Sequence, residues 1–571
     1  MKNKVPNIKE DESFFGQFKK FKPIENLHGS AHFAEFSDLA EMSLLGNEGC
    51  YVGGFKHEGD IHYLQHNGPE HMLTVAPTRS GKGVGIVLPT LLSWRESVVC
   101  LDIKGENWAL TAGWRKRDAG NICLKFEPTA LSGSVKFNPL AEIPIETEFE
   151  VSEAQNIAAM LVDPDGEGLN DHWARSSFSL LSGVIIHCLY EEKIVGRTAT
   201  MTDLASFLSN PERPILETLD YMKAFDHLGT MPHQFVAQTA QEMLNKDPKE
   251  LSSVVSTAMS FLSLYRDPIV ARNTSESEFR VSDLMNHDRP VSLYLVIQPR
   301  HRLRLKPLIR LLLTQIINGL TNEMQFEDGK SKRSYKHRLL LKLDEFASLG
   351  RLPIVEETIA YMAGYGIKAS IIVQDHAQLY KSYGEDESIS SNCHIQIAYA
   401  PNKLSTAEEL SKKLGKTTIT RKSRTAQRGQ GVLSPSHYSE KWEEIERPLM
   451  TPDECSRLPG PKKDKDGLVV EAGDMLIFVA GFPAIYGKQI LYFKDPVFSS
   501  RSKISPPFIS DIVNDGRAFA SVARWAASSV KPDAQGFEDY DLEENSDDEV
   551  EESVYCAAEA DGSSDLSNFI P

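Results

Sequence analysis

The sequence predicts an α/β fold in which a mostly parallel sheet is wrapped by helices and interrupted by an inserted all-α domain. Short apolar runs alternate with helical periodicity before about residue 150 and again after residue 285. Between these two parts helical periodicity dominates, and no run has convincing strand character. A glycine-containing loop joins an early strand to a helix, which is typical of phosphate-binding α/β proteins.

The predicted elements follow from these patterns in chain order. A β-rich segment begins near Gly49, and the apolar runs that predict strands are His71–Val75, Ser97–Ile103, Ile122–Phe126, Pro290–Ile297, Arg338–Leu343, Ser370–Gln374, His394–Ala400, Met475–Ala480 and Lys488–Tyr492. Helices are expected at Thr111–Arg117, Glu153–Leu161, Trp173–Tyr190, Pro232–Leu244, Glu250–Leu264, Leu305–Asn322, Pro353–Ala363 and Thr406–Leu414. The basic segment Lys416–Arg428 is expected to be weakly structured and to lead into a long loop that ends near Ser439.

Charge is distributed unevenly along the 571 residues. The net charge is −18, from 62 Lys and Arg and 80 Asp and Glu. Fourteen of the acidic residues lie after Lys531, where there is no Lys or Arg, so 66 acidic and 62 basic residues precede them and the body carries only −4. This tail lacks a periodic apolar face and is expected to be a disordered acidic C-terminal tail or a docking tail. The near-neutral body does not argue against a nucleic-acid partner.

Cysteine usage and hydropathy exclude several classes of protein. The seven cysteines contain no C-x-x-C pair, which argues against a zinc site or a disulfide framework and favours a reducing cytoplasm. No signal peptide is visible, and the most apolar run, Phe178–Tyr190, is shorter than the roughly 18 residues that span a bilayer. Near the N-terminus, Phe14, Phe15, Phe18 and Phe21 beside lysines predict either a membrane-surface helix or a terminal segment packed on the body.

The most informative stretch runs from His71 to Glu106 and contains a loop close to a P-loop. The loop Ala76–Gly83 reads Ala-Pro-Thr-Arg-Ser-Gly-Lys-Gly between a predicted strand and a predicted helix. In a P-loop, backbone N–H groups at a helix N-terminus wrap phosphate oxygens and a lysine reaches the outer phosphates. Lys82 would supply that charge. The alternative is a chance Gly-Lys pair in a turn.

Two positions depart from the P-loop pattern. Ala76 replaces the first glycine, and Gly83 stands where a Ser or Thr usually ligates Mg²⁺. The metal ligand on that side is therefore open, with Ser80 or Thr78 as substitutes. The candidate nucleotide-binding residues are Thr78, Arg79, Ser80, Gly81, Lys82, Gly83 and Val84.

A P-loop site also needs carboxylates at the end of a neighbouring strand. The apolar run Leu339–Leu343 leads into Asp344 and Glu345, so Asp344 would hold the metal and Glu345 would polarise the attacking water. Gln374, at the end of another apolar strand, could sense the outer phosphate. The alternative is that these polar residues simply end their strands. Asp102, Lys104 and Glu106 also follow a strand and could lie near a nucleotide or be solvated.

Several separated motifs, in order from about residue 27 to 500, resemble the coupling-protein ATPases of type IV secretion and conjugation systems, the TraG/TraD-like family. The motifs are LHGSA near residue 28, PTRSGKGVGIVLPTLLSW, HWARSSFSLLSGVI near residue 172, LDEFASLGRLP, IIVQD and RPLMTPDE. The resemblance implies a RecA-like P-loop NTPase sheet with an inserted all-α domain. It also implies a homohexameric ring on the cytoplasmic face of the bacterial inner membrane, which uses ATP and Mg²⁺ to pass relaxase-bound DNA or protein substrates to the secretion channel.

Carried over by position, the resemblance makes Lys82 the phosphate-binding lysine, Asp344 and Glu345 the Walker B pair, and Gln374 the motif glutamine. The catalytic residues would be Lys82, Glu345 and Gln374. The Gly83 variant recurs in this family. The domains would be an N-terminal segment (1–35), a nucleotide-binding domain in two parts (36–150 and 286–510), an all-α domain (151–285), and a C-terminal extension with the acidic tail (511–571).

Two features depart from the family. Its members usually begin with transmembrane helices, and none is visible here, which predicts a soluble or truncated form or an anchor supplied by a partner. Some members carry an arginine finger after the Walker B pair, where this chain has Ala363–Gly366. Arg351, Arg304 and Arg310 are the candidates that remain.

The basic segment suggests a DNA contact. Its cations are Lys416, Arg421, Lys422, Arg424 and Arg428. Such a cluster would bind phosphates without regard to sequence, although a solvated surface loop would look the same. The acidic tail would repel DNA, so a basic partner or a solubilising role fits it better.

Three functions remain open from sequence. The first is an ATP-hydrolysing coupling protein. The second is a non-hydrolytic docking and recruitment platform of the same secretion system. The third is a cytoplasmic DNA translocase, against which the inserted helical block and the HGSA and RPLMTPDE motifs argue.

Overall fold

The structure is a computed structural model that describes residues 27–163, 166–321, 325–327, 330–332, 334–427 and 437–514. These residues belong to one compact unit that ends at Ala518. The N-terminal phenylalanines and the acidic tail, for which we made predictions, lie outside the described residues. Among the described helices, none combines the length and the apolar composition needed to cross a bilayer.

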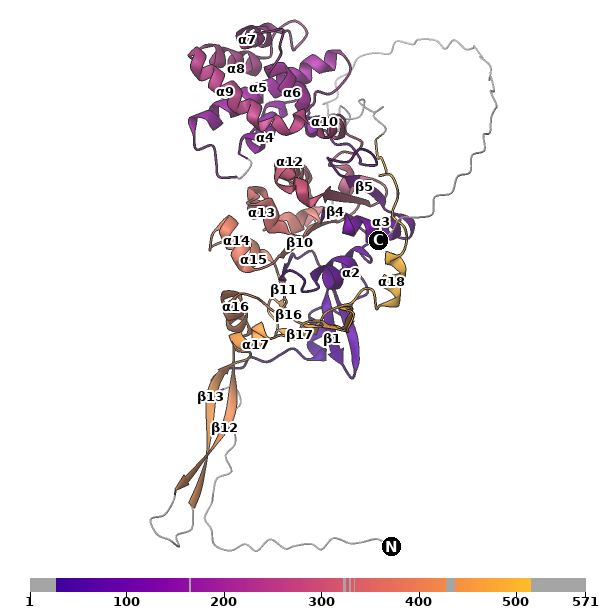
Figure 1. Ribbon diagram of the computed structural model, residues 1–571, viewed down its shortest axis with the longest axis vertical. Coiled ribbons are helices and arrows are strands. Elements are labelled where there is room, and N and C mark those ends of the chain that lie inside the picture. The colour runs from indigo at the N-terminus through magenta and orange to yellow at the C-terminus, as the bar shows by residue number, and fades with distance from the viewer. Residues whose placement is uncertain are drawn as a thin grey trace, which may run out of the picture. The chain divides into compact units, whose positions relative to one another are not determined.

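An eleven-stranded sheet organises the described part of the chain (Figure 1). In spatial order it runs β2 (Asp60–His66), β1 (Cys50–His57), β17 (Ile485–Lys488), β16 (Asp474–Val479), β11 (Ile395–Ala398), β3 (Met72–Val75), β10 (Ile367–Val373), β9 (Leu339–Leu343), β4 (Ser97–Ile103), β6 (Val291–Ile297) and β5 (Ile122–Phe126). Neighbouring strands from β11 to β5 are parallel, and those from β11 to β2 are antiparallel. The predicted α/β fold with a mostly parallel sheet is confirmed.

Helices cover both faces of the sheet. Alternate residues of the central strands face opposite cores, as Leu73 and Val99 do on one side and Met72 and Val98 on the other. The helices outside the inserted block are α1 (Phe36–Glu41), α2 (Leu88–Leu91), α3 (Glu106–Arg117), α12 (Arg302–Leu320), α13 (Pro353–Thr358), α14 (His376–Tyr383), α15 (Ile389–Asn392), α16 (Leu404–Leu414), α17 (Pro452–Ser456) and α18 (Pro496–Ser502).

The long connection between β5 and β6 is helical. It contains α4 (Glu150–Val162), α5 (His172–Ile194), α6 (Met201–Leu208), α7 (Ile215–Ala224), α8 (Gln234–Leu244), α9 (Pro248–Phe261), α10 (Pro268–Asn273) and α11 (Asp283–Asn286). The sequence prediction missed α6 and α7. A capping box marks the start of α6, where the Thr200 hydroxyl accepts from the Asp203 N–H and the Asp203 carboxylate accepts from the Thr200 N–H.

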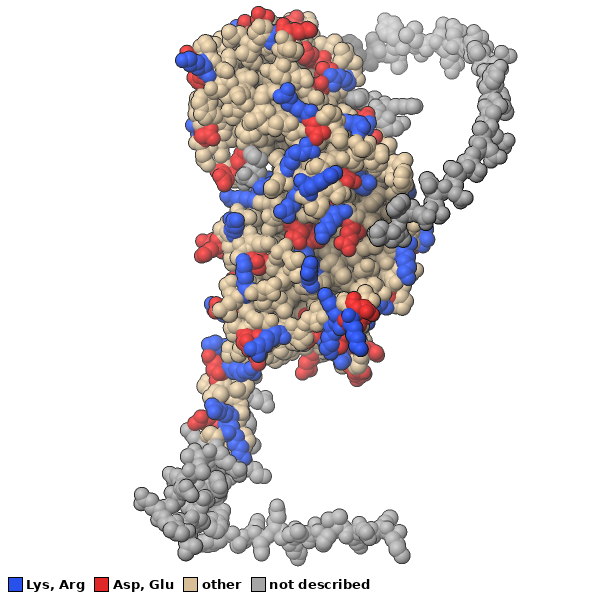
Figure 2. All heavy atoms as spheres, viewed as in Figure 1, with Lys and Arg blue, Asp and Glu red and all other residues tan. Residues whose placement is uncertain are grey.

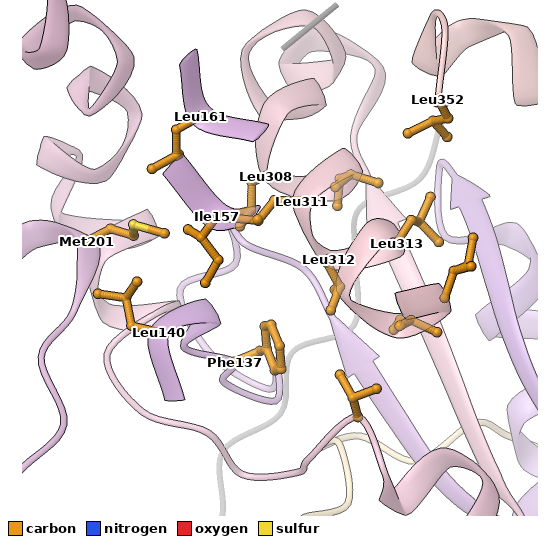
Figure 3. Close-up of a cluster of buried hydrophobic side chains, with 14 of the residues drawn as sticks. Phe137, Leu140, Ile157, Leu161, Met201, Leu308, Leu311, Leu312, Leu313 and Leu352 are labelled. Atoms are coloured by element: carbon orange, nitrogen blue, oxygen red, sulfur yellow. The ribbon is translucent and has the colours of Figure 1, made fainter. Parts of the chain in front are cut away.

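The helical block shares a hydrophobic core with the sheet domain. In Figure 3, Ile157 and Leu161 of α4 lie beside Leu308 and Leu311 of α12, and all four side chains are buried. Each such side chain contributes roughly 1.5–3 kcal/mol when it is fully removed from water. Because α12 directly follows β6, this core ties the helical block to the central sheet.

Arg115 of α3 is a fully buried cation in this fold. It donates hydrogen bonds to the Ser292 hydroxyl, to the Asn121 side-chain oxygen, and to the carbonyl oxygens of Leu91, Trp94 and Glu96. These partners lie on β6, at the end of α2, between α2 and β4, and between α3 and β5. One side chain therefore ties the helix after β4 to the loop before it.

Replacing Arg115 by Met should lower the free energy of unfolding by about 3–5 kcal/mol, because the buried acceptors lose their donors together. Arg117→Met is the matched control, since Arg117 is exposed and its ion pair is with the exposed Asp118. Its effect should stay within about 0.5 kcal/mol. Thermal or urea denaturation of both variants measures the difference, and equal stabilities would contradict the structural role of Arg115.

One predicted loop is wrong. Lys416–Arg428 was expected to be weakly structured, but β12 (Lys416–Gln427) pairs antiparallel with β13 (His437–Pro448) in a long hairpin. The β-branched run Thr417–Thr420 favours a strand, and Arg421 stands opposite Glu443 across the ladder. The partner strand lies beyond the turn, so periodicity within the basic segment alone did not reveal the pairing.

The last strand is also shifted from its predicted position. β17 covers Ile485–Lys488 instead of Lys488–Tyr492, because the turn at Gly481 is short and β17 pairs directly with β16. The chain then leaves the sheet. Two further short hairpins pair β7 (Gln325–Glu327) with β8 (Lys330–Lys332) and β14 (Lys462–Lys463) with β15 (Val469–Glu471).

Candidate active site

The predicted P-loop connects β3 to η1 (Gly83–Val87), a single turn of π-helix that continues into α2. Two residues of the loop have left-handed backbone conformations, Arg79 with φ of 64° and Gly81 with φ of 97°. The Ser80 N–H donates to the Pro77 carbonyl oxygen at 3.2 Å, and the Gly85 N–H donates to the Gly81 carbonyl oxygen at 2.8 Å. The loop is therefore a tight turn that opens a helix, as phosphate binding requires.

Two glycines of this segment have packing reasons. A Cβ at Gly81 would lie 3.1 Å from the Gln489 side-chain oxygen, and one at Gly85 would lie 3.1 Å from the Ile490 carbonyl oxygen. The chain that leaves β17 runs along the P-loop and its helix, which explains why this strand ends at Lys488, the first residue of its predicted range. Gly83 has open space around its Cβ position, so packing does not require glycine there.

Lys82 reaches both predicted carboxylates. Its Nζ lies 2.6 Å from Glu345 Oε1 and 3.2 Å from Asp344 Oδ1. The lysine side chain is 13% exposed, while those of Asp344 and Glu345 are 23% and 28% exposed. The structure thus brings Lys82 together with two neighbouring carboxylates that lie 262 and 263 residues later in the chain.

The electrostatics of this cluster favour its charged forms. Burial would lower the pKa of the Lys82 ammonium, but Asp344 and Glu345 outweigh it and raise that pKa. Burial would raise the pKa of the Glu345 carboxyl, but Lys82 and the Gln374 hydrogen bond lower it overall. Both groups are therefore charged at neutral pH.

Gln374 completes the cluster from the end of β10. Its Nε2 donates to Glu345 Oε2 at 2.9 Å, so the two carboxylate oxygens of Glu345 are held by different partners. The backbone of Glu345 is left-handed, with φ of 56°, a conformation that non-glycine residues rarely adopt. A strained residue aimed at a lysine and a glutamine is typical of a functional site.

Sheet topology explains why these residues meet. β3, β10 and β9 are adjacent and parallel, with Val75 opposite Val373, and Ile371 opposite Leu343. The P-loop, Gln374 and the Asp344–Glu345 pair all follow carboxyl ends of these strands. Ligand sites of open α/β sheets lie at this edge.

The remaining loop residues take different environments. Thr78 and Arg79 are exposed, whereas Ser80, Gly83 and Val84 are half-buried. The Ser80 Oγ is buried and, among the described residues, has no hydrogen-bond partner. Asp344 fits a metal ligand because its carboxylate is half-exposed beside the loop.

Asp102 corrects one sequence interpretation. Of the two alternatives for Asp102, solvated or near a nucleotide, the solvated one is wrong: the residue is 1% exposed and accepts from the backbone N–H groups of Gly105 and Trp108 at 3.1 and 2.8 Å. Burial raises the pKa of its carboxyl to about 6, against the effect of these hydrogen bonds. Its role is to cap α3. Lys104 and Glu106 are exposed.

The three candidate finger arginines do not contact Glu345. Arg304 pairs with Asp267 at 2.5 Å, Arg351 pairs with Glu356 at 3.2 Å, and Arg310 is 6% exposed. Sequence reasoning missed Arg302, the exposed first residue of α12, whose charge helps to lower the pKa of Glu345. The basic run at residues 300–304 was the available signal.

The chain is similar to proteins of a known family. The sequence profile described as "Type IV secretory system Conjugative DNA transfer" matches residues 32–516. A conjugal transfer protein TraG of Escherichia coli is 50% identical over 510 residues, which cover 86% of this chain and 80% of TraG. Protein VirD4 of Agrobacterium fabrum is 28% identical over 483 residues, which cover 82% of this chain and 66% of VirD4.

Solved structures with the same fold include the plasmid coupling protein TrwB. Its complex with ADP and Mg²⁺ aligns with a TM-score of 0.53 at 15% identity, over 85% of this chain and 99% of TrwB. Its complex with a non-hydrolysable ATP analogue, ADPNP, aligns with a TM-score of 0.54 at 17% identity over the same shares. At this identity the likeness supports the fold alone.

Proposed function

This chain belongs to the type IV secretory system conjugative DNA transfer family, and on that premise we propose that it is an ATP-hydrolysing coupling protein. It recruits relaxase-bound DNA or protein substrates and drives them to the secretion channel. The observation that carries the proposal is the Lys82–Glu345–Gln374 cluster, which places a phosphate-binding lysine against a carboxylate that can activate water.

In this proposal each residue of the cluster has one task. Backbone N–H groups of the P-loop and the Lys82 ammonium hold the outer phosphates. Glu345 orients a water and accepts its proton, and Gln374 keeps the carboxylate turned toward the phosphate. Asp344 holds the metal, with Thr78 or Ser80 as the candidate partner on the loop. Bound ATP and Mg²⁺ supply the transferable phosphoryl group and the charge that stabilises its transfer.

Nucleotide must displace an internal ion pair. In this structure Lys82 is paired with both carboxylates, so an arriving phosphate competes with Glu345 for the ammonium. Losing that contact frees one Glu345 oxygen for water while Gln374 still holds the other. The same exchange that binds the phosphate thus prepares the base.

Assembly and location are part of the proposal. A homohexameric ring at the cytoplasmic face of the inner membrane, next to secretion-channel components, is what the family resemblance implies for this chain. Two alternatives would use the same fold. A recruitment platform would bind substrates without hydrolysing ATP, and a cytoplasmic DNA translocase would move DNA without the secretion channel.

ATP turnover of the purified chain tests the function, measured alone and with single- or double-stranded DNA alongside its mass in solution. We expect turnover that DNA stimulates, because a translocating motor hydrolyses ATP faster when it is bound to the strand that it moves. Nucleotide binding without turnover under any of these conditions would favour the recruitment platform. Directional movement on duplex DNA without association to a secretion component would favour the translocase.

The hairpin offers a smaller DNA contact than its basic strand suggested. Lys416 pairs with Glu446 at 2.5 Å, and the Lys422 ammonium lies 5.2 Å from the centre of the Trp442 ring. Figure 2 shows both signs of charge on the described part of the hairpin. The side chains of Arg424 and Arg428 lie outside the described residues.

Replacing Arg421 and Lys422 by Glu together should reduce the stimulation of ATP turnover by DNA and the salt dependence of that stimulation, and leave basal turnover unchanged.

A further inference from the structure

Gln489 lies against the P-loop although it is more than 400 residues away in sequence. It is the first residue after β17 and is 4% exposed. Its side-chain oxygen, Oε1, lies 3.1 Å from the position that a Cβ at Gly81 would occupy, and the Pro461 ring lies 3.9 Å from the same point. The Gln489 carboxamide and Pro461 therefore form a wall beside the phosphate-binding loop.

Two hydrogen bonds to the start of β16 fix the orientation of Gln489. Its backbone N–H donates to the Gly473 carbonyl oxygen at 2.9 Å, and its Nε2 donates to the Asp474 carbonyl oxygen at 3.4 Å. Asp474 itself accepts from the Tyr486 hydroxyl at 2.6 Å and pairs with Lys488. The amide nitrogen is thus turned toward β16, and the oxygen toward the loop.

The turn of residues 457–461, which precedes β14, belongs to the same support. A Cβ at Gly473 would lie 2.8 Å from the Pro459 carbonyl oxygen and 2.8 Å from the Pro461 nitrogen, so this turn is pressed against the start of β16. The Asp474 N–H donates to the Pro459 carbonyl oxygen at 2.7 Å. The turn and Gln489 together form a rigid support for one side of the P-loop.

Two buried polar atoms on either side of this contact lack partners. Among the described residues, neither Gln489 Oε1 nor Ser80 Oγ has a hydrogen-bond partner. One is an acceptor only and the other is a hydroxyl that can donate. Ser80 directly precedes Gly81, the residue that Gln489 touches. Because a buried polar group without a partner is unfavourable, this state of the loop is less stable than one in which the two atoms are hydrogen-bonded.

We propose that Gln489 is a positioning residue of the P-loop, whose side-chain oxygen accepts a hydrogen bond from the Ser80 hydroxyl when the loop closes on nucleotide. The inference rests on the proposed nucleotide binding at this loop. A bond that forms in the bound state and is absent in the free state adds its full value to affinity. Arg79 and Gly81, which flank Ser80, both have left-handed backbone conformations.

The inference assigns the Ser80 hydroxyl to Gln489 and not to the metal. Because a hydroxyl that donates its proton keeps lone pairs that could bind a cation, the Mg²⁺ dependence of ADP affinity distinguishes the two roles. Ser80 then does not replace the missing P-loop hydroxyl at Gly83 as a Mg²⁺ ligand. Thr78 or solvent completes the coordination on that side.

A double-mutant cycle on the full chain tests the proposal, with ADP affinity as the readout. Ser80→Ala and Gln489→Leu should each weaken ADP binding about fivefold, the value of one ordinary hydrogen bond, and the double variant should lose no more than either single one. The losses should be equal with Mg²⁺ and with EDTA. Free Ser80→Ala protein should keep or raise its melting temperature, because this variant removes only a buried polar atom that lacks a partner. Gln489→Leu also removes the Nε2 hydrogen bond to the Asp474 carbonyl oxygen, so its melting temperature is measured beside its ADP affinity.

Gln65→Leu is the matched control, because Gln65 is also a buried glutamine whose Oε1 has no hydrogen-bond partner in the part of the chain that the structure describes, and it lies on β2, away from the P-loop. It should leave ADP affinity unchanged. Independent losses that multiply to about 25-fold, or no loss in either single variant, would overturn the inference alone. A Ser80→Ala loss that appears only with Mg²⁺ would overturn it in favour of metal ligation. A wild-type chain that binds no ADP would contradict the proposed function as well.

Discussion

Lys82→Ala should reduce ATP turnover by at least about 10²–10³-fold, the usual cost of removing one preorganised charge from a phosphoryl-transfer site. The structure sharpens the reason. Lys82 is the cation between Asp344 and Glu345, so its removal takes away the phosphate ligand and leaves two carboxylates close to where phosphate must bind. Nucleotide affinity should fall together with turnover, measured by phosphate release and by binding of a fluorescent ADP.

Lys403→Ala is a suitable control for that experiment. Lys403 is about half exposed and pairs at 3.0 Å with Asp375, the residue after Gln374. The variant therefore removes a lysine ion pair that lies beside the site but outside the Lys82–Glu345–Gln374 cluster. Its turnover should match that of the wild type, since exposed ion pairs contribute little. Equal turnover in wild type and Lys82→Ala would refute a P-loop mechanism at this site.

Glu345→Gln should separate binding from hydrolysis. The amide keeps the size of the side chain but cannot accept a proton from water, so turnover should fall about 10²–10⁴-fold. Nucleotide affinity should be kept or increased, because the neutral amide competes less with phosphate for Lys82. Single-turnover hydrolysis and equilibrium binding on the same preparation measure the two effects.

Glu106→Gln provides the comparison for this variant. Glu106 also follows a strand of the parallel sheet, but it is exposed and begins α3. Its turnover should be normal. Normal turnover in Glu345→Gln would assign proton acceptance elsewhere, and substrate transfer that persists in a hydrolysis-deficient Glu345→Gln chain would favour the recruitment platform.

The strand pattern could be predicted from sequence because it is a local signal. Ser97–Ile103 and Ile122–Phe126 are confirmed at both ends. Both are buried along nearly their whole length, so apolar residues predominate in them, with Asp102 and Lys125 as the charged exceptions. The P-loop connection and the strand that leads into Asp344 were identified for the same reason.

Elements that depend on a distant partner were not predictable in the same way. The β12–β13 hairpin is mostly polar, so its hydrophobic periodicity is weak, and the signal for a strand is the pairing across the hairpin. β17 was placed too late because the apolar residues after it pack on the P-loop helix instead of pairing in the sheet. Asp102 could not be assigned from sequence, because an aspartate after a strand can either cap the following helix or line a ligand site.

The sequence by itself determined which residues form the candidate site, since Lys82, Asp344, Glu345 and Gln374 each stand in a local motif whose chemistry is readable. Only the tertiary structure decided how they meet. Because β10 lies between β3 and β9, Gln374 and Lys82 each donate a hydrogen bond to a different carboxylate oxygen of Glu345. It also decided that Gln489 supports the loop, a contact without a local signal. Periodicity records which face of an element is buried, whereas the order of strands in a sheet is set by packing among elements far apart in the chain.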